Sequence, residues 1–150
     1  MTQLLLQLHD AKTAPQGSGE LLEKETVILS VSFENRCGYC MAARTAGGKG
    51  KGLSEEAVEA LRSGERLPDP RLDAVSRFSR AVVRERGRPS AEEVQAFLDA
   101  GFTRQNLLEV LVGVSFKTLS NYTNNLADTP LDDAFAKHAW EGREASAAVR

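Results

Sequence analysis

The chain has 150 residues, with 19 lysines and arginines against 21 aspartates and glutamates, and a formal net charge of −2. This length suits one domain around one core, and the near balance of charge gives no surface-wide attraction for nucleic acid or an anionic membrane. The opening apolar run, Leu4 to Leu6, is too short for a membrane span or a secretory signal. We therefore expect a cytoplasmic protein that binds neither nucleic acid nor membrane.

The first part of the chain gives conflicting local signals. Residues 1–19 read as an N-terminal arm, because Pro15, Gly17, Ser18 and Gly19 interrupt any regular element before about Glu20. Between Val27 and Phe33 apolar residues alternate with other residues. That pattern taken alone favours a β-strand.

Helix signals become clear further along. Helix starts are expected at Ser54, at Asp69 followed by Pro70, and at Ser90, which forms a capping box with Glu93. Gly64, Gly87 and Gly101 favour the corresponding helix ends. The arginines at positions 80, 84, 86 and 88 are interpreted as a solvated helix face, because no aromatic residues are interleaved among them.

The strongest predicted helix begins at Thr103 and runs towards Leu126. It is apolar over more than half of its circumference, which is typical of a central helix or of a subunit interface. Thr129 and Pro130 introduce a short terminal helix. Trp140 is expected to anchor it by packing, and residues 141–150 form a polar tail.

The two cysteines, Cys37 and Cys40, lie three residues apart where helix-forming residues resume after the break at Glu34 and Asn35. Residues with this spacing share a helix face, within the roughly 4.4 to 6.8 Å Cα separation that a disulfide tolerates. The amides and dipole at a helix N-terminus also favour a thiolate, which is the reactive form. The pair therefore predicts redox chemistry.

Two structural alternatives stay open for the cysteines. They could be half of a zinc site, although zinc would need two more ligands from a chain whose only histidines are His9 and His138. They could also be two buried cysteines without chemistry. We favour redox chemistry and expect neither a metal ion nor a cofactor.

Glu25, eleven intervening residues, Cys37, two intervening residues, Cys40 and a basic residue at position 44 form a spaced motif. With the segments 42–45, 58–62, 78–87, 117–124 and 130–132, it resembles the alkylhydroperoxidase D and carboxymuconolactone decarboxylase superfamily. The resemblance implies an all-α, homo-oligomeric bundle of about six to seven helices over residues 20–140, which overrules the strand interpretation. It also indicates that the region before the motif is short.

The resemblance also implies a mechanism. Cys40 would be the thiolate that attacks a hydroperoxide, Cys37 would resolve its sulfenic acid to a disulfide, and Glu25 would accept the thiol proton. A dithiol reductant, lipoyl or thioredoxin-like, would then reduce the disulfide. The family motif has a histidine where this chain has Arg44, and relatives often have another at the position of Asn125. Arg44 can hold a thiolate by charge but cannot shuttle protons.

Other interpretations remain open at this stage. Arg44 can simply pair with Glu25, and the asparagines at 121, 124 and 125 can satisfy backbone groups near a helix end. Glu25 can instead stabilise a helix start. Besides a thiol peroxidase, the chain could be a decarboxylase-like lyase, as some members of the superfamily are without using a cysteine pair. It could also be a non-catalytic redox-sensing module, because the expected histidines are absent.

Overall fold

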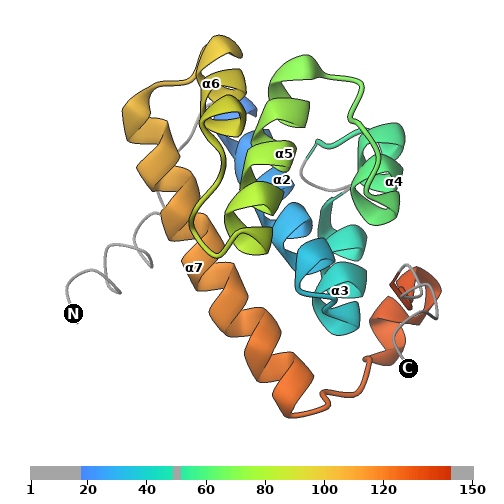
Figure 1. The fold of residues 1–150 in the computed structure, drawn as a ribbon. Helices are drawn as coiled ribbons and strands as arrows, with labels where there is room; N and C mark the ends of the chain where they lie inside the picture. The colour runs from blue at the N-terminus through green and yellow to red at the C-terminus, as the bar shows by residue number, and fades with distance from the viewer. Residues whose placement is uncertain (1–17, 49–51, 143–150) are drawn as a thin grey trace, which may run out of the picture.

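The computed structural model describes residues 18–48 and 52–142, and every regular element in these ranges is helical (Figure 1). The elements are α2 (Ser18–Glu34), α3 (Gly38–Gly48), α4 (Glu55–Ser63), α5 (Pro70–Arg84), α6 (Ala91–Asp99), α7 (Arg104–Leu126) and the 3₁₀ helix η2 (Asp133–His138). The all-α prediction is confirmed. Most of the predicted arm 1–19 and of the predicted tail 141–150 lies outside the described residues.

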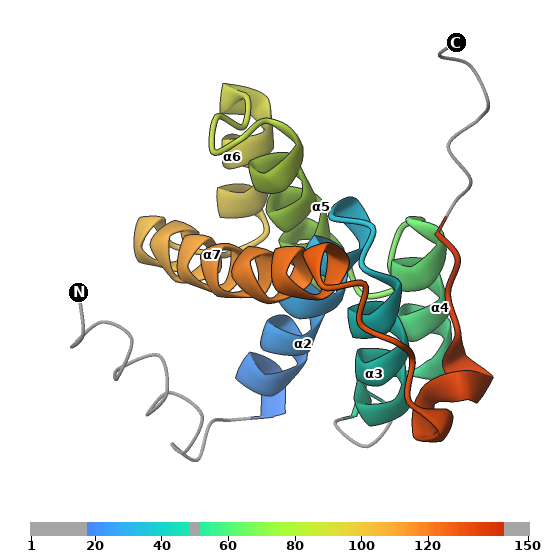
Figure 2. The same ribbon diagram turned by 90° about the horizontal axis from the view of Figure 1, so that it is seen from below.

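Helix α2 is the central element of the bundle. It contacts α3, α4, α5 and α7 (Figures 1 and 2). Within it, Val27, Ile28, Leu29 and Val31 are all buried, so apolar residues are needed around most of its circumference. A helix buried on every side has no helical periodicity in its sequence. This is why the local pattern between Val27 and Phe33 wrongly favours a strand.

The buried hydroxyls on α2 all have hydrogen-bond acceptors. Thr26 donates to the carbonyl of Leu22 and Ser32 to that of Ile28, each at 2.8 Å. Ser30 donates to Ser76 on α5, also at 2.8 Å. These bonds satisfy the hydroxyls that would otherwise be costly in the core.

Two apolar clusters lie on different sides of α2. The first joins α2 to α5, α6 and α7 around three phenylalanines, in which the ring of Phe97 stacks on that of Phe102 at 4.3 Å. The second joins α2 to α3 and α4 around Leu29 and Met41, both fully buried. The central helix thus connects the packing of both halves of the bundle.

The predicted helix starts are confirmed. Ser54, Asp69, Ser90 and Thr103 are N-caps whose side chains accept hydrogen bonds from backbone amides of the following turn. Gly64 ends α4 in the left-handed conformation, with φ of 77°. Trp140 packs on Phe33 with ring centroids 5.7 Å apart and donates from Nε1 to the carbonyl of Arg62 at 2.9 Å, which confirms it as an anchor.

The interpretation of the arginines as a solvated face is wrong for Arg80. Its Nε donates to Glu34 at 2.7 Å and its Nη1 to the carbonyl of Gly64 at 2.8 Å. The guanidinium also lies 4.4 Å from the ring centroid of Phe33. Arg80 therefore joins the ends of α2 and α4, a contact between elements that the sequence pattern of one helix does not contain.

The turn between α2 and α3 sets the position of the cysteines. Arg36 adopts a left-handed conformation with φ of 50°, and the amide of Cys37 returns to the carbonyl of Ser32 at 3.0 Å. This hydrogen bond is typical of a helix end at which the left-handed residue is usually glycine. Only residues 35–37 separate the end of α2 from the start of α3, and the two helices pack against each other.

Among residues 18–48 and 52–142, no helix combines the length and the hydropathy that a membrane span needs.

The left-handed conformation of Arg36 gives a stability prediction. We expect Arg36→Gly to raise the free energy of unfolding by about 1 kcal/mol, because a side chain is strained at positive φ and glycine is not. Arg36→Ala, which removes the charge but keeps Cβ, should leave stability nearly unchanged. Chemical denaturation of the three proteins measures both effects, and a loss of stability in Arg36→Gly would contradict the assignment.

Candidate active site

Cys37 and Cys40 lie together at the N-terminus of α3, as the sequence predicts. The carbonyl of Cys37 accepts the first hydrogen bond of the helix from the amide of Met41 at 2.9 Å. The sulfur of Cys37 also accepts from the backbone amide of Cys40 at 3.4 Å, so this thiol occupies the place of an N-cap side chain. Both residues are buried, with 0% of Cys37 and 3% of Cys40 exposed.

One face of α7 covers the thiols, and Figure 2 shows the C-terminal half of this helix crossing near the junction of α2 and α3. The polar residues at positions 117, 120, 121 and 124 follow one another at steps of three, one and three residues, so they share that face. Asn124 donates from Nδ2 to Sγ of Cys40 at 3.2 Å. The hydroxyl of Ser120 lies 3.9 Å from the same sulfur.

Sequence reasoning missed Lys117 and Ser120. Lys117 is only 4% exposed, an unusual burial for a lysine. The available signal was a polar stripe in a helix that is otherwise mostly apolar. That signal becomes informative only when the neighbour facing the stripe is known.

Asn121 connects this face of α7 to the end of α2. It is fully buried, its Oδ1 accepts from Asn35 at 3.1 Å, and its Nδ2 donates to the hydroxyl of Ser32 at 3.2 Å. Asn35 also donates to the hydroxyl of Thr118 at 3.2 Å. These bonds set the position of α7 relative to the turn that carries the cysteines.

The structure separates the asparagines into different environments. Asn125 is exposed and donates to the carbonyl of Asn35 at 3.0 Å, so for this residue the backbone-satisfying interpretation is confirmed. Asn124, by contrast, contacts a thiol and also donates to the carbonyl of Ser120 at 3.1 Å within α7. Asn125, at the position where the resemblance implies a histidine in relatives, therefore contacts the end of α2.

The surroundings assign different protonation states to the two thiols. The hydrogen bond from the Cys37 thiol, the charge and hydrogen bond of Lys117, and Asn121 lower the pKa of Cys40 to about 4, although burial opposes this change. The same hydrogen bond, together with burial, raises the pKa of Cys37. These surroundings favour the negative charge on Cys40 and the proton on Cys37.

Glu25 and Arg44 form an ion pair, with 3.5 Å between Oε1 and Nη1. The Glu25 side chain is 2% exposed and that of Arg44 is 30% exposed. Arg44 follows Cys40 by four residues, one turn along α3, so the pair lies next to the thiol site. The four site residues predicted from the sequence therefore come from one place in the fold: Glu25 from α2, Cys37 from the turn after it, and Cys40 and Arg44 from α3, which contacts α2.

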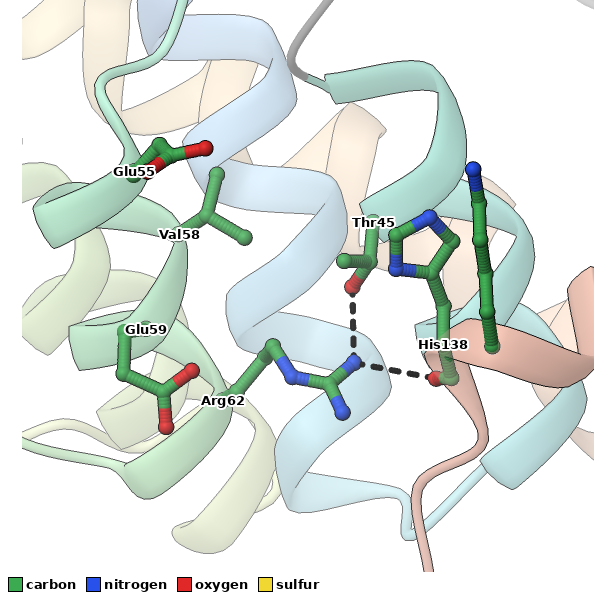
Figure 3. Close-up of a pocket in the computed structure, with 7 residues that line it drawn as sticks. Thr45, Glu55, Val58, Glu59, Arg62 and His138 are labelled. Carbon is green, nitrogen blue, oxygen red and sulfur yellow. Dashed lines mark hydrogen bonds between the residues drawn. The ribbon is translucent and has the colours of Figure 1, made fainter.

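A cavity of about 410 Å³ lies between α3, α4 and η2, apart from the thiols (Figure 3). It is lined by Thr45, Glu55, Val58, Glu59, Arg62, Lys137 and His138. Arg62 donates to the hydroxyl of Thr45 at 2.9 Å and to the carbonyl of His138 at 3.2 Å. Thr45 is five residues after Cys40, roughly 140° around a helix, so the cavity opens on another side of α3.

The zinc alternative needs a cluster of ligands. Among the described residues, no group of three or more His, Cys, Asp or Glu side chains is placed to hold a metal ion. His138 lines the cavity between α4 and η2, and His9 lies outside the described residues.

The low pKa of Cys40 gives a direct prediction. We expect the ultraviolet absorbance of a thiolate to appear in the folded, reduced protein as the pH rises through about 4, and in the unfolded chain near the ordinary value of 9.0. Because the folded value is the lower one, this thiolate stabilises the fold fully above the unfolded pKa, and the contribution is lost as the pH falls through the folded pKa. Cys40→Ser should lack the low transition. A folded protein whose thiols titrate only near the ordinary value would contradict the prediction.

Comparison with known proteins agrees with the resemblance drawn from the motif. The family model described as the carboxymuconolactone decarboxylase family matches residues 1–82, more than half of the chain, including Glu25, Cys37, Cys40 and Arg44. A search of curated proteins finds no match. The helical bundle and the matched segment together place this chain in the carboxymuconolactone decarboxylase family.

Proposed function

We propose that the protein is a thiol-dependent peroxidase that reduces hydroperoxides through a dithiol–disulfide cycle of Cys37 and Cys40. The observation that carries the proposal is the unequal pair of thiols at the start of α3. One sulfur is held as a thiolate by Asn124 and Lys117, and the other keeps its proton beside it. A thiolate next to a protonated thiol is the arrangement that a two-cysteine reduction needs.

In the proposed cycle, the Cys40 thiolate attacks the terminal oxygen of the hydroperoxide. The S–O bond forms as the O–O bond breaks, which leaves a sulfenic acid on Cys40 and an alkoxide or hydroxide that takes a proton. Cys37 then loses its proton and attacks the Cys40 sulfur, so a disulfide forms and water leaves. A lipoyl or thioredoxin-like dithiol returns both cysteines to the reduced state.

A reducing compartment such as the cytoplasm suits this cycle, because both cysteines must be regenerated as thiols. The redox-sensing alternative is favoured by one observation, the almost complete burial of both cysteines. A sensor would form the disulfide but would not turn over rapidly. The lyase alternative leaves the polar surroundings of Cys40 without a use.

The test uses the reduced protein and one equivalent of an organic hydroperoxide, followed by intact mass and free-thiol content. We expect both thiols to be lost in the wild-type protein, because each sulfur enters the disulfide. Cys40→Ser should retain its remaining thiol, and Cys37→Ser should accumulate a sulfenic acid that a dimedone-type reagent traps. Catalytic turnover with a dithiol reductant separates the peroxidase from the sensor. Thiols that persist near neutral pH would contradict both.

We also propose that the protein is a homo-oligomer whose subunits meet through the outer face of α7. Seven large apolar residues on this helix are exposed: Leu108, Leu111, Val112, Phe116, Leu119, Tyr122 and Leu126. Positions 108, 112, 115, 119, 122 and 126, of which 115 is a serine and the others are in the apolar set, follow alternating steps of four and three, the spacing of helix–helix seams. The only charged residue between positions 110 and 127 is Lys117, which is buried. An uncharged apolar face of this kind matches the same face of a second copy.

A charge on this face should weaken the assembly. We expect Leu119→Glu to lower the molar mass measured by light scattering after size-exclusion chromatography, because the carboxylate would be desolvated against an apolar surface. Ala96→Glu, which adds the same charge to an exposed position of α6, is the control and should leave the mass unchanged. A wild-type protein that is monomeric at micromolar concentration would contradict the assembly.

A further inference from the structure

The proposed cycle needs a proton donor, and the motif position that supplies a histidine in the family holds Arg44. Arg44 pairs with Glu25, and a guanidinium does not release a proton near neutral pH. Without another donor, the alkoxide or hydroxide that leaves from the hydroperoxide would be expelled unprotonated into a buried site. This is unfavourable, because a new charge has little solvation there.

Lys117 is placed to supply this proton. It is 4% exposed and lies on the face of α7 that contacts Cys40, one turn before Ser120 and two turns before Asn124. Within the described residues no carboxylate forms an ion pair with it. Its interaction there is instead with Cys40, as a charge and as a hydrogen-bond donor. A buried ammonium whose partner is a thiolate resembles a functional group more than a structural ion pair.

We propose that Lys117 takes over the proton-carrying role of the motif histidine: its ammonium holds the Cys40 thiolate and then protonates the alkoxide or hydroxide released by the hydroperoxide. Lysine suits both parts of the role, because its ammonium is a compact charge that also carries three N–H donors, one of which can be passed on as a proton. The inference rests on the proposed peroxidase function and names a further residue of the same site.

The proton balance of the cycle is then complete. Cys40 attacks as the thiolate, the hydroperoxide becomes an alcohol or water by taking a proton from Lys117, and Lys117 is left neutral. The neutral amine next accepts the proton of Cys37, which allows the Cys37 thiolate to attack the sulfenic acid. The hydroxide released as the disulfide forms takes up one proton from the solvent, which replaces the proton that Cys40 lost when it became a thiolate, and leaves as water.

Several other charged or titratable groups surround Cys40 and must be considered in any pH titration. Cys37 and Tyr39 are its neighbours on α3, and Tyr39 donates from its hydroxyl to Asp132 at 2.8 Å. Arg44 and Glu25 form the ion pair one turn further along. Lys117 is the charged residue of α7 that interacts with Cys40. Variants at position 117 therefore change one group while the others remain.

The experiment compares Lys117→Met, which keeps most of the length of the side chain without its charge, with Lys117→Arg, which keeps the charge but does not release a proton near neutral pH. Lys137→Met removes the same charge from an exposed lysine on η2 and is the control. Two quantities are measured in the reduced proteins: the pH midpoint of thiolate absorbance, and the single-turnover rate with an organic hydroperoxide. Lys117→Gln serves if Lys117→Met does not fold.

In Lys117→Met we expect the thiolate midpoint to rise by about one to three pH units and the single-turnover rate at neutral pH to fall about a hundredfold or more. Lys117→Arg should restore the midpoint but not the rate. A Lys117→Met protein that titrates like the wild type, or a Lys117→Arg protein that reacts as fast as the wild type, would overturn the inference.

The two proposals fail in different ways. A wild-type protein that forms the thiolate yet does not react with hydroperoxide overturns the proposed function. The titration midpoint of Lys117→Met then still decides the assignment of Lys117 as the partner of the thiolate, since that measurement uses no hydroperoxide. An unshifted midpoint overturns the assignment, and a raised one supports it.

Discussion

The constraint that organises this molecule is the burial of a negative charge on sulfur. A thiolate that is almost completely removed from solvent is costly unless donors and a positive charge surround it. Cys40 meets this requirement with partners from two directions: the Cys37 thiol at the start of α3, and Asn124, Asn121 and Lys117 on α7. The site therefore exists only when α7 lies across the turn between α2 and α3.

The position of α7 is in turn set by polar contacts within an apolar bundle. Asn121 is fully buried and bonds to both Asn35 and Ser32, so a displacement of α7 by one residue would leave buried amide groups without partners. The apolar clusters around α2 provide most of the burial but tolerate small shifts. The asparagine network supplies the precise register that catalysis by Cys40 would need.

Arg44, at the position where the resemblance implies a histidine, affects how charge is distributed around the site. Arg44 is half of an ion pair with buried Glu25, and this pair is neutral overall. The cation that acts on Cys40 is Lys117, which belongs to a different helix. The residue to which we assign the proton-carrying role, Lys117, therefore lies on α7 and not at position 44 on α3. A motif defined by spacing along α2 and α3 does not include Lys117.

The sequence by itself determined the local features of the protein. Capping residues such as Ser54 and Ser90 mark helix starts because the caps are formed within one turn, and the spacing of Cys37 and Cys40 brings two thiols to one helix end for the same reason. The spaced motif also indicated the family. The alternation of apolar residues between Val27 and Phe33 wrongly favoured a strand, because the sequence of a helix that is buried on all sides has no helical periodicity.

Only the tertiary structure decided which residues surround the thiols. Arg80 looked like part of a solvated face and instead joins two helix ends, and Lys117 looked like one residue of an apolar helix and instead faces Cys40. Arg80 lies 46 positions from Glu34 in the chain, and Lys117 lies 77 positions from Cys40. Contacts of this kind arise from the packing of whole helices, and the periodicity of a single helix carries no information about which neighbour its polar face will meet.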